Sequence, residues 1–174
     1  SNEPIHRLTI KLIKKLALKK SKNTVLDYDN TLIFSRKDDA TMTYMKQFGY
    51  CPGLGFIGNN VVYVENRNGN SDAQTLQQDT LERMFALLND EGIHIDRFRA
   101  DGASYQLSVL AVIRDNVNKF YIRGRMTQIL NEAINQVDHW EKISFAGQEA
   151  FRGSTTFIPF RRIAKKHQKH LLHP

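Results

Sequence analysis

Two aspartates, Asp27 and Asp29, stand two residues apart in the apolar segment TVLDYDNTLI at residues 24–33. Because side chains alternate along a strand, both carboxylates are expected on one face of a sheet. Carboxylates in this position support two kinds of chemistry. One can attack phosphorus while the other acts as general acid, or they can ligate a divalent cation. The ten residues alone do not separate the two hypotheses.

A third aspartate, Asp101, ends another apolar run in the segment FRADGASY. If the strands that carry Asp29 and Asp101 are sheet neighbours, their backbones lie ~4.8 Å apart. The two carboxylates could then share one divalent ion, or hold two ions ~3.5–4 Å apart. Mg²⁺ (or Mn²⁺) accepts oxygen ligands and keeps waters, so two or three carboxylates are sufficient. The alternative is that Asp101-Gly102 is only a turn before a helix cap at Ser104.

The elements that must position these residues follow from apolar periodicity. A basic amphipathic helix is predicted in residues 1–23, with Ile5, Leu8, Leu12 and Leu16 on its packed face. Strands are predicted at 24–34, on both sides of a Gly58-Asn59-Asn60 turn, at 93–100 and at 119–124, and helices from Ser71 or Asp72 to about Asn89 and over 104–116. Residues 35–47 are read as a connection, residues 128–136 as a short helix, and WEKISF and TTFIPFRR as further strands.

This pattern predicts an α/β fold of the ribonuclease H-like kind. Its mixed sheet has the order β-β-β-α-β-α-β, with helices on its faces and additional C-terminal strands. We expect a catalytic core at residues 24–126, the start of a β-strand insertion at 127–160, and a basic tail at 161–174.

The composition is that of a globular protein. The chain has 174 residues, 41% of them hydrophobic, and no apolar run long enough for a membrane span, so no membrane association is expected. The one cysteine, Cys51, excludes an internal disulfide, is expected to pack as a small hydrophobe, and fits a cytoplasmic location. The chain begins Ser1-Asn2 without a methionine, so it is expected to be a piece of a longer protein.

Positive charge is concentrated at the two ends. Residues 1–22 carry seven Lys or Arg against one Glu, residues 161–174 carry five and no acid, and the part between them has a net charge of −4. Basic ends around an acidic centre suit a polyanion whose phosphate meets metal-loaded carboxylates. The residues predicted to contact such a polyanion are Lys11, Lys15, Lys19, Arg161, Arg162, Lys165 and Lys166. Solvated helix faces are the alternative.

The segments LDYDNTLIFSRKDDATMTYMKQFGYCPGLGFI, ENRNGNSDAQ and FRADGASY resemble, in this order, DDE transposases of bacterial insertion sequences, over roughly residues 24–160. The similarity is to the group with a β-strand insertion in the core. The resemblance implies that Asp29 and Asp101 are the first two catalytic acids and metal ligands, with Asp27 the less favoured claimant for the first. It also implies DNA as partner (element ends and target), a possible homodimer on DNA, and a location on the bacterial nucleoid.

The family also needs a third acid, a glutamate on a helix beyond the inserted strands. No Glu or Asp follows Phe160, so this acid is expected to be missing from a truncated chain. Glu132 is the alternative within the chain, and Glu149 a weaker one. The complete protein would hydrolyse a phosphodiester at the end of the element and transfer the freed 3′-hydroxyl to target DNA.

Two other functions remain open from the sequence. VLDYDNTLI also resembles the first motif of haloacid dehalogenase-like phosphatases, which implies Asp27 as nucleophile and Asp29 as general acid. The hairpin predicted after the motif counts against alternating β-α units. A non-catalytic DNA-binding module is the second alternative. His167, His170 and His173 have a spacing that could chelate a metal on one helical face, but a solvated basic tail is the simpler interpretation.

Overall fold

The computed structural model describes residues 2–16, 23–158 and 160. The chain divides into two compact units, Ser1–Gly124 and Arg125–Pro174. The first unit contains every strand and helix that surrounds Asp29 and Asp101, and the second contains one helix and a hairpin.

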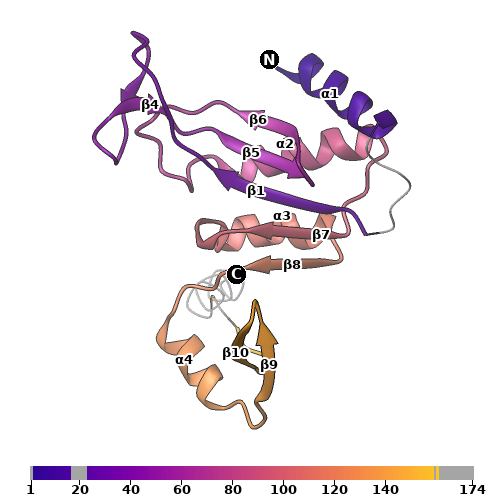
Figure 1. Ribbon diagram of the computed structural model, residues 1–174, viewed down its shortest axis with the longest axis vertical. Helices are drawn as coiled ribbons and strands as arrows, with labels where there is room; N and C mark the ends of the chain where they lie inside the picture. The colour runs from indigo at the N-terminus through magenta and orange to yellow at the C-terminus, as the bar shows by residue number, and fades with distance from the viewer. Residues whose placement is uncertain (1, 17–22, 159, 161–174) are drawn as a thin grey trace, which may run out of the picture. The chain divides into compact units, whose positions relative to one another are not determined.

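The first unit is built on a five-stranded mixed sheet in the order β6-β5-β1-β7-β8 (Figure 1). The strands are β1 (Val25–Asn30), β5 (Gly53–Ile57), β6 (Asn60–Glu65), β7 (Arg97–Ala100) and β8 (Lys119–Ile122). β5 is antiparallel to both β1 and β6, whereas β7 is parallel to β1 and β8 is parallel to β7. This is the predicted ribonuclease H-like topology, which confirms the fold class and the adjacency of the first and fourth predicted strands.

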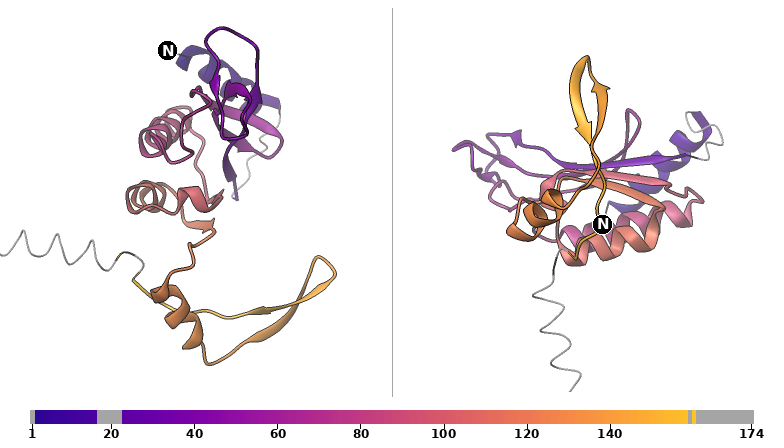
Figure 2. Two further views of the ribbon diagram at one scale, coloured as in Figure 1. Left: turned by 90° about the vertical axis from the view of Figure 1, so that its left-hand side faces the viewer. Right: turned by 90° about the horizontal axis from the view of Figure 1, so that it is seen from below.

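Local sequence accounts for the hairpin and for the crossovers. Gly58, between β5 and β6, has φ +59°, a left-handed conformation that glycine adopts without strain, so the predicted turn is confirmed. Two helices, α2 (Gln77–Asp90) and α3 (Leu107–Asn116), connect the parallel strands and lie side by side on one face of the sheet (Figure 2). The core between the sheet and these helices includes the fully buried Leu26, Phe98 and Phe85.

The helix α2 begins later than predicted. We expected a cap at Ser71 or Asp72, but the first helical residue is Gln77 and Leu76 before it has φ +53°. A residue in the left-handed conformation does not continue a right-handed helix toward its N-terminus. Asp72 instead accepts a hydrogen bond from the Gln74 N–H (3.0 Å) in the preceding turn. The predicted helix at 104–116 likewise splits, into a 3-10 turn at Gly102–Ser104 and α3.

The N-terminal helix α1 (Glu3–Leu16) lies along the edge strand β6, but its buried face was predicted wrongly. Ile10 and Ile13 are buried, whereas Ile5, Leu8 and Leu12 are 66%, 60% and 49% exposed. The helix carries two apolar stripes, and periodicity does not say which one meets a partner. The choice is made by packing and by Lys14 of α1, whose Nζ donates to the Glu91 carbonyl at 2.6 Å.

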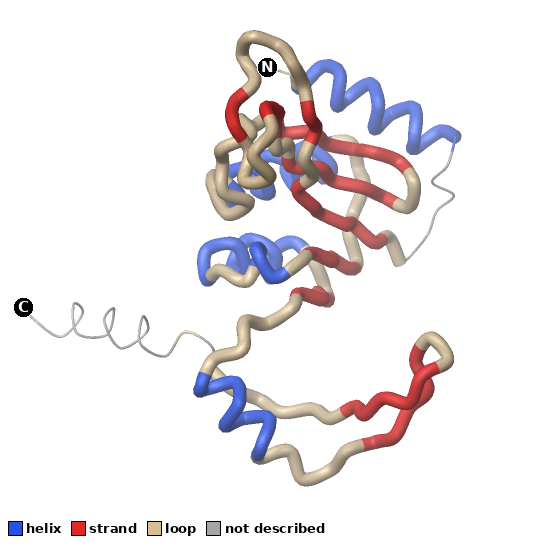
Figure 3. The backbone as a smooth tube through the Cα atoms, turned by 60° about the vertical axis from the view of Figure 1, so that its left-hand side comes forward, coloured by secondary structure: helices blue, strands red, loops and turns tan. Residues whose placement is uncertain are grey.

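A second, three-stranded sheet interrupts the region that we expected to be one strand and a connection. β2 (Ile33–Phe34), β4 (Phe48–Tyr50) and β3 (Thr41–Met42) pair antiparallel in the order β2-β4-β3 (Figure 3). The predicted strand at 24–34 is therefore interrupted: β1 ends at Asn30, and the N–H of Thr31, the next residue, donates to the Pro52 carbonyl. Because β1 ends there, Asp29 is its second-last residue.

The second unit contains α4 (Gln128–Asn135), β9 (Glu141–Phe145) and β10 (Gln148–Arg152). The helix and the strand in WEKISF were predicted. TTFIPFRR was predicted wrongly as a strand, because residues 153–158 contain none, and Arg161 and Arg162 lie outside the described residues. The partner of β9 is QEAFR instead, set by a tight turn at Ala146 and Gly147, whose φ values of +51° and +76° match the twist of a two-residue hairpin.

Candidate active site

Residues some seventy positions apart meet because β1 and β7 are parallel neighbours. The register pairs Asp27 with Arg99 and Tyr28 with Ala100. The next residue on β1 is Asp29, and the next residue after the end of β7 is Asp101. Asp101 has extended backbone angles (φ −76°, ψ −177°), which continue the direction of β7. Because neighbouring strands lie about 4.8 Å apart, we expect the two aspartates to lie near each other at this end of the sheet.

The alternation of side chains puts the acids on one face. Leu26, Tyr28 and Phe98 are buried in the core, and Asp29 and Asp101 are exposed. The residues between the buried ones must point the other way, so Asp27, Asp29, Arg99 and Asp101 share the face opposite to α2 and α3. The prediction that Asp27 and Asp29 lie on the same face is confirmed.

Each of the two exposed aspartates is held through one oxygen. The Asn30 N–H donates to Asp29 Oδ1 at 2.8 Å, and the Ala103 N–H donates to Asp101 Oδ1 at 3.0 Å. Asp101 is thus itself the cap of the 3-10 turn, in place of the predicted cap at Ser104. A carboxylate fixed through one oxygen still presents the second to a ligand.

Asp27 is held differently. Arg99 donates from Nε to Asp27 Oδ1 at 2.5 Å and from Nη2 to Asp27 Oδ2 at 2.6 Å. These hydrogen bonds raise the pKa of the Arg99 guanidinium, which stays cationic. Both carboxylate oxygens of Asp27 are therefore engaged, and an engaged carboxylate is a poor nucleophile for phosphorus. This arrangement, together with the antiparallel hairpin beside β1, does not favour the phosphatase hypothesis.

A cavity of about 440 Å³ opens beside Asp101. It is lined by Asn30, Leu32, Tyr44, Cys51, Gly69, Asn70, Ser71, Asp72, Ala73 and Asp101. Cys51 is only 6% exposed, and burial raises the pKa of its thiol, so it is a packed neutral side chain as predicted. The lining is mixed, and its two carboxylates, Asp72 and Asp101, give it a negative charge that suits a cation.

A buried polar layer under β1 supports the site. Arg67, 7% exposed, donates to the Tyr28 hydroxyl (3.2 Å), to Thr80 Oγ1 (2.9 Å) and to the Ala73 carbonyl (3.3 Å). It ties the loop before α2 to the residue between the two aspartates of β1. Sequence reasoning did not identify Arg67 as a site residue, because nothing in its pattern separates a buried arginine from a solvated one.

A second buried contact fixes the turn after Asp101. Gln77, the first residue of α2, donates from Nε2 to Ser104 Oγ at 2.5 Å, and Gln106 Nε2 donates to Gln77 Oε1 at 3.1 Å. Gln77 and Ser104 are 1% and 0% exposed. These amide and hydroxyl groups hold the start of α2 against the turn that Asp101 caps. Sequence reasoning missed this contact as well.

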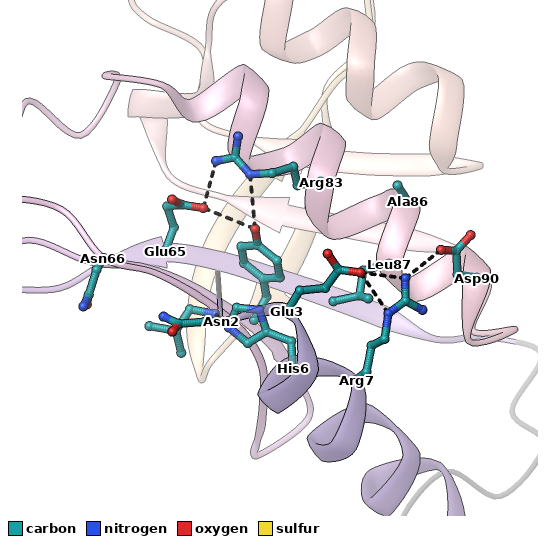
Figure 4. Close-up of a pocket in the computed structure, with 12 residues that line it drawn as sticks. Asn2, Glu3, His6, Arg7, Glu65, Asn66, Arg83, Ala86, Leu87 and Asp90 are labelled. Carbon is teal, nitrogen blue, oxygen red and sulfur yellow. Dashed lines mark hydrogen bonds and ion pairs between the residues drawn. The ribbon is translucent and has the colours of Figure 1, made fainter.

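A cavity of about 500 Å³ lies between α1, β6 and α2 and contains none of the predicted site residues (Figure 4). His6 stacks on Tyr63 with ring centroids 4.4 Å apart, and its Nε2 accepts from the Val64 N–H at 3.3 Å. Burial lowers the pKa of His6. Arg7 contacts Asp90 at 3.0 Å. These contacts fasten α1 to the sheet.

The remaining predicted residues are distributed as follows. Glu132 lies in α4, where Gln128 donates to it at 2.9 Å, and Glu149 lies in β10, 2.5 Å from Lys142. Lys11 is 60% exposed and 3.9 Å from Glu91, and Lys15 is exposed on α1. Outside the described residues lie Lys19, Arg161, Arg162, Lys165, Lys166, His167, His170 and His173.

The donor chemistry of Asp29 and Asp101 fits a hard divalent cation such as Mg²⁺, which takes one or two carboxylates and completes its shell with water and phosphate. Within residues 2–16, 23–158 and 160, no group of three His, Cys, Asp or Glu side chains is placed to hold a metal ion. In the same residues, no helix is long and apolar enough to cross a bilayer.

Comparison with known proteins gives a family and three structural likenesses. The family model described as Transposase DDE domain group 1 matches residues 1–164. No curated protein matches. The Mos1 transposase paired-end complex with left transposon end is similar at 12% identity and TM-score 0.44, over 68% of this chain and 40% of that one.

Two further solved structures belong to the same protein. The catalytic domain of Mos1 mariner transposase has 11% identity and TM-score 0.43, over 99% of this chain and 82% of that one. The Mos1 Strand Transfer Complex has 13% identity and TM-score 0.45, over 71% and 41%. This chain therefore spans less than half of the transposase chains in the two complexes.

Proposed function

The chain belongs to the Transposase DDE domain group 1 family, and on that premise we propose that it forms part of the catalytic core of a DNA transposase. The complete protein would cleave a phosphodiester at the end of a mobile element and transfer the freed 3′-hydroxyl to target DNA. The observation that supports this proposal best is the parallel pairing of β1 with β7 up to Tyr28 and Ala100, after which the next residues of the two segments are Asp29 and Asp101.

In this proposal Asp29 and Asp101 hold the divalent cation, Mg²⁺ or Mn²⁺. When bound, such an ion neutralises phosphate charge and lowers the pKa of water or of a hydroxyl group. The chain's own contribution is to fix the carboxylates. The N–H groups of Asn30 and Ala103 each occupy one oxygen, and the Gln77–Ser104 contact keeps the turn after Asp101 in place. Carboxylates held in this way lose little freedom when they bind the ion.

The third acid stays part of the proposal. A glutamate beyond the end of this chain is the preferred candidate, Glu132 is the candidate within it, and Glu149 is weaker. If the acid lies outside, the chain carries the cation but catalyses strand transfer only as part of the longer protein.

We propose DNA as the partner, with the phosphate backbone contacted by Lys11, Lys15 and the basic residues outside the described part. Each such contact makes affinity fall with salt, by a slope of roughly −0.9 in log–log terms per phosphate neutralised on duplex DNA. Origin from a bacterial insertion sequence, a homodimer on DNA and a nucleoid location rest on the sequence resemblance alone.

The test is Mn²⁺ binding to the 174-residue chain, measured by electron paramagnetic resonance of free Mn²⁺. Asp29→Asn and Asp101→Asn should each weaken binding by roughly tenfold or more, because each removes one of two charged ligands. Asp115→Asn is the matched control, since Asp115 is an exposed aspartate of α3 that pairs with its neighbour Arg114. Wild-type affinity in both site variants would refute the proposal.

The rival functions give different results in parallel assays. A phosphatase would hydrolyse an artificial phosphomonoester and lose that activity on Asp27→Asn. A non-catalytic DNA-binding module would bind DNA equally with and without Mg²⁺, and Asp29→Asn and Asp101→Asn would leave its affinity unchanged.

A further inference from the structure

Two consecutive levels on the open face of β1 and β7 carry different pairs of side chains. The first level holds Asp27 opposite Arg99, which we call the ion-pair rung. Two residues further along the chain in each case come Asp29, in β1, and Asp101, directly after β7, which we call the carboxylate rung. The two rungs are separated by two residues on each strand, or roughly 6.6 Å at the usual rise of a parallel strand.

The ion-pair rung is a bidentate arginine–carboxylate pair. The planar guanidinium of Arg99 meets both carboxylate oxygens of Asp27, at 2.5 and 2.6 Å. Bidentate pairs of this kind are stronger and more directional than a single contact, and lysine does not reproduce them. The side chains of Arg99 and Asp27 are 60% and 30% exposed, so the pair faces the same solvent as the carboxylate rung.

The charges of the two rungs match one divalent ion. Three aspartates and one arginine give a net charge of −2, equal and opposite to that of Mg²⁺ or Mn²⁺. Without Arg99 the same face would carry three free carboxylates. Asp27, two residues before Asp29 on the same face of β1, would then be free to contact the cation, either directly in place of a water or through one of the waters that the ion keeps.

We propose that Arg99 is a specificity-determining residue that confines the divalent cation to Asp29 and Asp101 by occupying both oxygens of Asp27. The inference rests on the proposed function, because it requires the carboxylate rung to bind the ion. This role would explain why, of the two aspartates of β1 on this face, Asp29 is available to a cation and Asp27 is not. Arg99 acts through Asp27 and is a positioning residue for the site.

The experiment is Mn²⁺ binding to the whole chain with four variants. Arg99→Met should tighten binding roughly tenfold, because it adds one carboxylate ligand. Asp27→Asn in the Arg99→Met background should return the affinity to within about twofold of wild type, since the added ligand is lost again. Asp27→Asn alone should weaken binding several-fold, because the guanidinium is left without its counter-charge next to the ion.

Arg97→Met is the matched control for charge. Arg97 lies two residues before Arg99 on the same face of β7, and its partner is Asp96, so the variant removes an equal charge without freeing Asp27. Equal tightening in Arg97→Met and Arg99→Met, or no reversal by Asp27→Asn, overturns the inference. A direct readout is the broadening of carboxyl carbon-13 resonances by Mn²⁺, which should reach Asp27 in Arg99→Met only.

The failures of the two proposals are distinguishable. If Asp29→Asn and Asp101→Asn leave Mn²⁺ binding unchanged, the proposed function is wrong. If they weaken it while Arg99→Met behaves as Arg97→Met does, the carboxylate rung stands and only the role of Arg99 is refuted.

Discussion

Arg67 provides the sharpest test of how the site is supported, through the substitution Arg67→Met. Its guanidinium is buried and its three hydrogen-bond acceptors, Tyr28, Thr80 and the Ala73 carbonyl, are all uncharged. Methionine has a similar length and fills the space without a charge. The substitution therefore separates the value of the hydrogen bonds from that of packing.

Two effects oppose each other in this variant. The buried Tyr28 hydroxyl and the Ala73 carbonyl each lose a donor, at about 1–3 kcal/mol apiece. Against this, a cation with no carboxylate partner no longer has to be buried, which recovers part of the loss. Thr80 is the least affected, because its hydroxyl keeps the Leu76 carbonyl as acceptor at 2.8 Å. We expect the free energy of unfolding to fall by about 3 kcal/mol, or Tm by roughly 10 °C for a unit of this size.

The measurement is urea denaturation followed by circular dichroism, with a double-mutant cycle. Tyr28→Phe alone should cost about 1 kcal/mol, and the double variant should cost about the same as Arg67→Met alone, because the shared hydrogen bond is lost only once. Arg83→Met is the control, since Arg83 is 52% exposed and pairs with Glu65, so its loss should cost less than about 1 kcal/mol. A loss under about 0.5 kcal/mol in Arg67→Met, or strict additivity with Tyr28→Phe, would refute the reasoning.

Two further predictions concern His6 and Gln77. Burial lowers the folded-state pKa of His6 below its unfolded value of 6.5, so its contribution to stability is complete above that value and is lost as pH falls through the folded pKa. Denaturation at pH 7 and pH 5 should show a smaller loss of stability in His6→Gln than in wild type, and an equal loss would contradict the assignment. Gln77→Leu removes the contact with Ser104 and should weaken Mn²⁺ binding several-fold by loosening the turn that Asp101 caps. Unchanged Mn²⁺ affinity in a folded Gln77→Leu variant would show that this contact is only structural.

The sheet was predictable because its signals are local. An apolar run, a Gly-Asn turn and the spacing of helices between later strands determine the topology, and the core residues Leu26 and Phe98 alternate as the pattern requires. That the side chains of Asp27 and Asp29 lie on one face of the sheet follows from strand geometry alone. These features need no knowledge of distant partners.

The features that were missed or wrong depend on tertiary contacts. In α1, the stripe of Ile5, Leu8 and Leu12 is the longer apolar one in the sequence, but the helix packs along β6 through the stripe of Ile10 and Ile13. The β-branched residues of TTFIPF favour a strand by propensity, but the hairpin partner of β9 is set by the Ala146-Gly147 turn next to it.

Residues 24–33 alone do not show whether Asp27 or Asp29 is the metal ligand, because side chains two positions apart on a strand lie on the same face of the sheet. The neighbouring strand makes the surroundings of the two aspartates different. The segments DYD at 27–29 and RAD at 99–101 have equal spacing, and the parallel register pairs the first aspartate, Asp27, with Arg99. Continuing that register by two residues sets Asp29 opposite Asp101. A slip of two residues would keep every side chain on its face yet set Asp27 level with Asp101. The pairing of Leu26 with Phe98, both fully buried, is what opposes that slip, so the core determines which carboxylate stays free.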